Sequence, residues 1–151
     1  RNSTTNCMFS KACKYGIRSV IYITKQSQLG RKVGLKEIAK AVDSPEAFTA
    51  KILQKLCRSK IIKSEKGPTG GFFIDEDKLH SVCLSHVVST IDGDTVYKDC
   101  GLGMKSCNPK KPCPVHNQFM VIRNNLKTML ETTTMLSLAS GVKSGLTFLK
   151  R

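Results

Sequence analysis

The sequence is poor in acidic residues and has no hydrophobic run long enough to cross a membrane. Only 11 Asp and Glu stand against 25 Lys and Arg in 151 residues. Apolar residues make up 40% of the chain, but none of their runs approaches the roughly 18 residues that a membrane span needs. The segment 1–7 lacks the apolar stretch of a signal peptide, and Met8 is a candidate natural start. We therefore expect a cytoplasmic protein with no membrane partner.

The usual signatures of an enzyme are also absent from the sequence. It has no cofactor fingerprint, no loop built to cradle phosphate and no pair of carboxylates in a plausible pocket. It has no internal repeats and no low-complexity segment. These absences weigh against a redox enzyme or an electron carrier, so we expect a protein without catalytic residues.

Positive charge is abundant and concentrated in the first half of the chain. Residues 1–75 contain 15 Lys and Arg against 5 Asp and Glu, whereas residues 76–151 contain 10 against 6. A net charge of +14 distributed in this way favours a polyanionic partner, with nucleic acid as the leading candidate. The alternative is a basic surface that only keeps the protein soluble.

Cysteine is the other abundant residue, with seven copies in a chain that shows no export signal. A reducing compartment favours metal binding or redox sensing over a disulfide scaffold. One loop, rich in Gly and Pro and therefore neither helix nor central strand, has the spacing Cys-x6-Cys-x5-Cys-x2-His. Thiolates and imidazole suit zinc or iron, and the wide first gaps favour an iron–sulfur cluster over a zinc knuckle. Disulfides or free thiols are the alternative. The candidate ligands are Cys100, Cys107, Cys113 and His116.

Hydrophobic periodicity predicts a mainly α-helical fold with one small β-hairpin. A short helix at 35–42 is followed by Ser44 and Pro45, which we expect to cap and to begin a third helix that ends near Ser59. Two β-prone runs then flank the glycine-rich turn 66–71. A helix-turn-helix with such a hairpin is a winged helix, although helical spacing alone also fits other three-helix bundles.

Five regions follow from this pattern. We expect a winged helix-turn-helix DNA-binding domain at 8–75, a connecting helix at 76–97, a Cys/His cluster-binding loop at 98–116, a dimerisation helix and C-terminal helix at 117–141, and a basic tail at 142–151. The candidate DNA contacts lie on the third helix and the hairpin tip: Ser44, Ala47, Phe48, Thr49, Lys51, Lys55, Lys66, Gly67 and Thr69.

The helix expected at about 115–134 carries an apolar stripe that a small winged helix cannot cover alone. A homodimer through 117–134 is the expected cover, and packing against the first helix, expected at 9–26, is the alternative. Among the remaining candidate ligands, His86 is interpreted as a structural or surface residue. Three cysteines are interpreted as small buried apolar groups: Cys13, Cys57 and Cys83.

Four segments resemble the Rrf2 family of bacterial winged-helix regulators, which includes IscR, NsrR, RirA and CymR. SKACKYGIR at 10–18 resembles the start of the family's first helix, and AKILQKL at 50–56 resembles its recognition helix. KGPTGGF at 66–72 is similar to its wing, and LSHVVSTIDG at 84–93 is similar to the helix before its cysteine loop. The resemblance extends over residues 8–141.

The resemblance implies a homodimeric transcriptional regulator that reads a palindromic operator in double-stranded DNA, most often as a repressor. It also implies an iron–sulfur cluster that responds to redox state, nitric oxide or iron. His116 stands where the IscR branch places its fourth ligand to a [2Fe–2S] cluster. Lys14 stands where the NsrR branch supplies an Asp to a [4Fe–4S] cluster, so [2Fe–2S] is favoured.

Two alternatives keep the DNA-binding domain and change the role of the loop. In one, the four ligands hold a structural zinc ion that folds the loop and senses nothing. In the other, the cysteines act as a metal-free thiol redox sensor, as the CymR relatives suggest. The first gap of six residues, where relatives commonly have five, leaves the geometry of the loop open.

Overall fold

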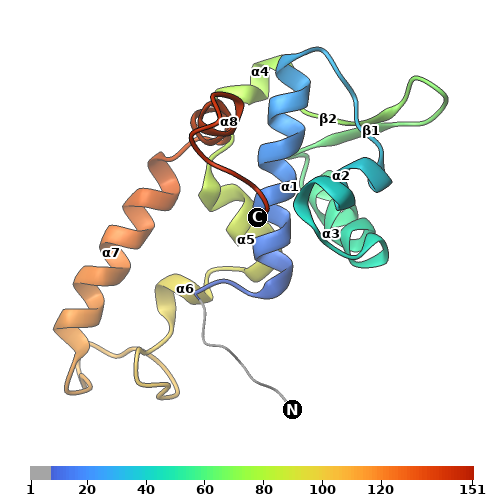
Figure 1. Ribbon diagram of the computed structural model, residues 1–151. Helices are drawn as coiled ribbons and strands as arrows, with labels where there is room; N and C mark the ends of the chain where they lie inside the picture. The colour runs from blue at the N-terminus through green and yellow to red at the C-terminus, as the bar shows by residue number, and fades with distance from the viewer. Residues whose placement is uncertain (1–7) are drawn as a thin grey trace.

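Helix α1 (Lys11–Gln28) lies at the centre of the fold and packs against most of the other helices and one strand of the hairpin (Figure 1). The computed structural model describes residues 8–151, so the expectation about residues 1–7 lies outside the described part. Ser10 caps α1, because its hydroxyl accepts a hydrogen bond from the backbone N–H of Cys13 at 3.0 Å. The helix thus begins and ends two residues later than the sequence predicted.

Helices α2 (Leu35–Val42) and α3 (Glu46–Arg58) pack against α1 and form the helix-turn-helix. Asp43, in the left-handed conformation with φ 53°, ends α2 and turns the chain. The predicted bounds of α2 are confirmed, but the predicted start of α3 is wrong. Pro45 occupies the cap position without a side-chain cap, and the Ser44 hydroxyl instead bonds the hydroxyl of Thr49.

The predicted hairpin is confirmed. Strand β1 (Lys63–Glu65) pairs in antiparallel register with β2 (Gly71–Phe73). A two-stranded hairpin is marginal alone, and here Val33 extends it. The Val33 N–H donates to Phe72 O at 3.0 Å, and the Phe72 N–H donates to Val33 O at 2.7 Å. The wing is therefore tied to the connection between α1 and α2.

The region 76–97, predicted as one connecting helix, contains three: α4 (Glu76–Leu79), α5 (Leu84–Asp92) and α6 (Thr95–Lys98). Gly93 and Asp94 interrupt the helix between the last two. A Cβ at Gly16 of α1 would lie only 2.2 Å from Ile91 Cδ1 of α5. The absence of a side chain at Gly16 therefore permits the close approach of the two helices. The hydrophobic core lies between α1 and the elements that pack against it.

Helix α7 (His116–Thr132) projects away from the winged helix and contacts α5 and α6 (Figure 1). Helix α8 (Met135–Lys143) follows and returns to α1, and it runs two residues past the predicted boundary at 141. The winged-helix fold with a long additional helix is thus confirmed. No helix of the described residues is long and apolar enough to span a bilayer.

Candidate nucleic-acid interface and cysteine loop

The outer face of α3 is basic and open to solvent. Its exposed side chains include Lys51, Gln54, Lys55 and Arg58. Ala47 is also exposed near the start of α3, and its small side chain allows close approach to a flat partner such as base edges. Six of the nine predicted DNA contacts are exposed in the structure: Ala47, Lys51, Lys55, Lys66, Gly67 and Thr69.

Thr49 does not lie on that face, so its predicted placement is wrong. Its side chain is fully buried, and its hydroxyl donates to Pro45 O at 2.8 Å in addition to the contact with Ser44. A buried hydroxyl must find partners inside the protein. Thr49 therefore ties the first turn of α3 to Pro45 and Ser44 from inside the protein.

Phe48 is half-buried and packs toward α1. Its ring meets that of Tyr15 edge-to-face, with centroids 5.7 Å apart and planes at 78°. The Arg18 guanidinium lies over the other ring, 4.8 Å from the Tyr15 centroid. Aromatic and cation–π contacts have preferred geometries, so these contacts favour one placement of the start of α3 against α1.

The wing presents Lys66 at its tip. The two neighbouring lysines are engaged, because Lys63 Nζ lies 2.5 Å from Asp75 Oδ2 and Lys32 forms an ion pair with Glu65. Within residues 8–151, Lys66 makes no ion pair. Its exposed ammonium is therefore the free positive charge of the hairpin tip.

The four predicted metal ligands lie in the loop before α7 and at the first residue of that helix. Cys107 Sγ lies 3.4 Å from His116 Nδ1, and His116 is the first residue of the helix. Cys113 lies near Cys100 and contributes to lowering the pKa of the Cys100 thiol. The structure thus brings the ligands together as two pairs, and no group of three in the described residues is placed to hold a metal ion.

The environment of Cys100 favours its thiolate. Hydrogen bonds from the backbone of Leu102 and Met104 are the main cause that lowers the pKa of the thiol. The Cys113 side chain and the charge of Arg123 lower the pKa further, whereas partial burial opposes them. Thiolates are the form of cysteine that binds metals. Three thiols and an imidazole, with the pKa of the Cys100 thiol lowered, are a donor set that fits iron–sulfur or zinc chemistry.

Two residues of α7 that the sequence analysis missed support the loop. Arg123 donates through Nη1 to Asp99 O at 2.6 Å and through Nη2 to Cys107 Sγ at 3.0 Å. A Cβ on Gly101 would lie 2.5 Å from the ring of Phe119, so only glycine fits there. Arg123 could have been found from the sequence, because it is a cation two helical turns after the candidate ligand His116.

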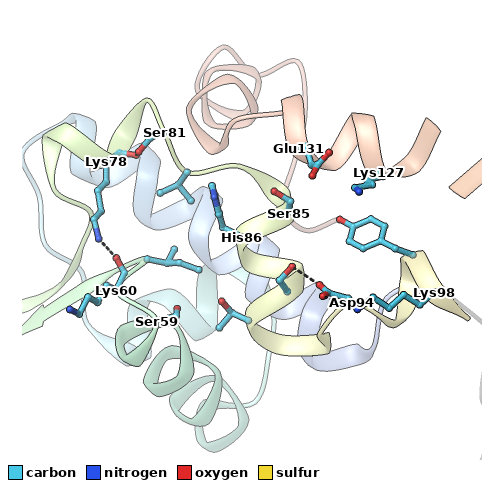
Figure 2. Close-up of a pocket in the computed structure, with 15 residues that line it drawn as sticks. Ser59, Lys60, Lys78, Ser81, Ser85, His86, Asp94, Lys98, Lys127 and Glu131 are labelled. Atoms are coloured by element: carbon cyan, nitrogen blue, oxygen red, sulfur yellow. Dashed lines mark hydrogen bonds and ion pairs between the residues drawn. The ribbon is translucent and has the colours of Figure 1, made fainter. Parts of the chain in front are cut away.

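A separate pocket of about 950 Å³ opens between α5, α6, α7 and the end of α3 (Figure 2). Lys127 and Glu131 of α7 face Ser85 and His86 of α5 across it. His86 is engaged as a cap, accepting the Cys83 N–H at 2.9 Å, so its predicted structural role is confirmed. None of the predicted site residues lines this pocket.

The remaining cysteines outside the loop differ in burial. Cys13 is fully buried, as predicted, but Cys57 and Cys83 are only partly buried. The prediction of small buried groups therefore holds for the α1 cysteine alone.

Comparisons with known proteins agree on one family. The profile of the Rrf2 family, described as an iron-dependent transcriptional regulator, matches residues 9–141. A candidate HTH-type transcriptional regulator of Aquifex aeolicus is 25% identical over 133 residues, covering 87% of this chain and 90% of the relative. A candidate HTH-type regulator of Mycobacterium tuberculosis is 24% identical, covering 87% and 81%.

Solved structures show the same fold. CymR of B. subtilis, described as the global cysteine regulator, superposes with a TM-score of 0.73 at 20% identity and covers 87% of this chain and 95% of its own. IscR of T. potens superposes with a TM-score of 0.73 at 12% identity and covers 96% and 95%. At these identities the structural similarity supports the fold only.

Proposed function

Because the chain belongs to the Rrf2 family of transcriptional regulators, we propose that it is a homodimeric DNA-binding repressor controlled by an iron–sulfur cluster. Membership of this family also confirms a regulator rather than an enzyme. The observation that carries the proposal is the position of the Cys/His set. It lies at the start of α7, on the path from the winged helix to the exposed apolar helix.

Two elements would read the DNA. The outer face of α3 enters the major groove, where Lys51 and Lys55 meet phosphates or bases and Ala47 allows close approach. The tip of the wing enters the minor groove with Lys66, flanked by Gly67 and Thr69. Ser44 and Phe48 would act near the start of α3, with Phe48 mainly holding the helix against α1.

The exposed apolar face of α7 supports dimerisation. Ile122 and Met129, one heptad apart on the same side of α7, are 58% and 43% exposed. Contiguous apolar side chains on a projecting helix are typical of an interface. A two-fold dimer through 117–134 would present two copies of α3 to the two halves of a palindromic operator.

The cluster would be held by Cys100, Cys107, Cys113 and His116, and the His ligand favours the [2Fe–2S] type. When bound, it supplies a centre that is altered by oxidation, nitric oxide or loss of iron. Arg123 would offset the negative charge of the Cys107 thiolate, to which it donates at 3.0 Å.

Control of DNA binding would come from ordering of the loop. Residues 101–106 are all exposed, and they are part of the loop 99–115 that joins α6 to α7. A common centre that draws the two ligand pairs together would shift α7 relative to the winged helix. Coupling of this kind is typically about 1–3 kcal/mol, or roughly 5- to 150-fold in affinity.

Purification without oxygen tests the cofactor directly. The chain should show broad visible absorption with iron and sulfide in the ratio of a [2Fe–2S] cluster. The Cys107→Ser variant should lose both, while Cys57→Ser, outside the loop, should keep them. A colourless protein with one zinc ion per chain would replace the cluster with a structural site. A protein that stays metal-free after reconstitution would support the metal-free thiol redox sensor instead.

A further inference from the structure

The C-terminal strap, residues 144–151, lies beyond the part of the chain that the family profile matches. After α8 the chain turns back sharply, because the N–H groups of Leu146 and Thr147 donate to Gly141 O at 3.1 and 3.2 Å. The end of the chain then lies against α1 (Figure 1). A segment without any helical or strand pattern is thus held in a defined place.

Three contacts seat the strap on the winged helix. Leu149 is partly buried and packs against the core. Its carbonyl accepts a hydrogen bond from Arg18 Nη1 at 3.2 Å, across 131 residues of sequence. Lys150 Nζ donates to Lys40 O at 3.1 Å, in the last turn of α2. A cation is favourable there because the C-terminal end of a helix carries partial negative charge.

These contacts continue to the start of the recognition helix. Arg18, which holds the strap, also lies 4.8 Å above the Tyr15 ring, and that ring packs edge-to-face on Phe48. Phe48 is in the first turn of α3. Because α3 has no side-chain cap at its start, Phe48 and Thr49 fix its direction by packing and by internal hydrogen bonds.

We propose that the strap positions the recognition helix through Arg18, Tyr15 and Phe48. Arg18 is a positioning residue, since it acts through Tyr15 rather than on DNA. The inference rests on the proposed DNA binding. Base contacts need exact placement of α3, whereas lysine–phosphate contacts tolerate small shifts. Loss of the strap should therefore reduce sequence discrimination more than total DNA binding.

The test compares Leu149→Ser with Leu146→Ser. Both variants make the same substitution in the strap and leave its charge unchanged, but Leu149 is partly buried and Leu146 is 81% exposed. The probes are the duplex that the unaltered chain selects from random sequences and a scrambled duplex of equal length. The ratio of the two affinities should fall on the order of tenfold for Leu149→Ser and stay unchanged for Leu146→Ser.

The Arg18→Lys variant is a second test of the same contacts, and it keeps the positive charge of the side chain. It should reduce the same ratio, and adding Leu149→Ser should cause no further loss, because both changes break one chain of contacts. Equal ratios for Leu149→Ser and Leu146→Ser, or additive losses in the double variant, would overturn the strap proposal. If the unaltered chain selects no sequence at all, the proposed DNA-binding function fails instead.

Discussion

At the scale of the residue, Gly71 shows how one position holds the wing in place. Its φ is +134°, and a Cβ there would lie 2.9 Å from Val33 N and Val33 O. Gly71→Ala should lower the free energy of unfolding by about 1–3 kcal/mol, because it adds backbone strain to a clash with Val33. Urea unfolding followed by circular dichroism measures this.

The matched control is Gly67→Ala at the tip of the same hairpin. Gly67 also has a positive φ, of 104°, but a Cβ there meets nothing within 4 Å. Its substitution should cost clearly less than that of Gly71. Equal costs for the two variants would contradict the close approach of the wing to Val33.

Cys13 makes the stability depend on alkaline pH. Burial, with a smaller contribution from the Asp92 carboxylate, raises its pKa from 9.0 to about 12. Above pH 9.0 the unfolded thiol ionises while the folded one keeps its proton, so the unfolded state binds fewer protons and stability falls. The contribution is fully present below pH 9.0 and is lost as the pH rises toward 12.

The Cys13→Ala variant isolates this effect. The stability advantage of the unaltered chain over the variant should shrink by about 1.4 kcal/mol per pH unit above the ordinary thiol pKa. Urea unfolding at pH 7 and one unit above the pKa of the free thiol measures the difference. A gap that stays constant with pH would show that the Cys13 thiol is not kept neutral by the fold.

The sequence was enough to choose the candidate site residues, but it did not predict which individual side chains contact one another. Of the four candidate ligands, Cys107 and His116 do contact each other at the start of α7, but the support of Cys107 by Arg123 depends on how the loop folds back, which spacing does not encode. Thr49 was misplaced for the same reason. The Thr49 hydroxyl forms hydrogen bonds with Pro45 O and the Ser44 hydroxyl only when the turn is folded.

At the scale of the element, local pattern predicted most of the helices. Helix α2 was predicted at its observed bounds, because its apolar spacing is short and regular and Asp43 ends it. Helix α6 was missed, since four residues are too few for a period. The role of the strap was also not predicted, because its partners Arg18 and Lys40 are more than a hundred residues away.

The recognition helix yields a salt-dependent prediction. Lys51→Gln should reduce the slope of log affinity against log salt concentration by about 0.9, because one phosphate contact is lost. Lys98→Gln removes the same charge from α6, where Lys98 lies 3.5 Å from Asp94, and should leave the slope unchanged. Fluorescence anisotropy with a labelled duplex measures both. Identical slopes for the two variants would remove α3 from the DNA interface.

At the scale of the whole molecule, the apolar face of α7 predicts a dimer. Ile122→Asp places a charge where the side chain is 58% exposed in the single chain and would be buried in the dimer. We expect a monomer in sedimentation velocity, because an unpaired charge inside an interface is strongly unfavourable.

Asn124→Asp introduces the same charge on the opposite side of α7 and should leave the dimer intact. A dimer that survives Ile122→Asp would place the interface elsewhere on the molecule. Dissociation by both variants would point to loss of helix α7 rather than of a contact face.

The central claim is that the loop at the start of α7 controls DNA binding. The most direct measurement is the affinity of one anaerobic preparation for its selected duplex, before and after the cluster is removed by a chelator. We predict a change within roughly 5- to 150-fold, the usual range for coupling between two sites. Equal affinities of the iron-loaded and iron-free protein would contradict the account, because the cluster would then not regulate DNA binding.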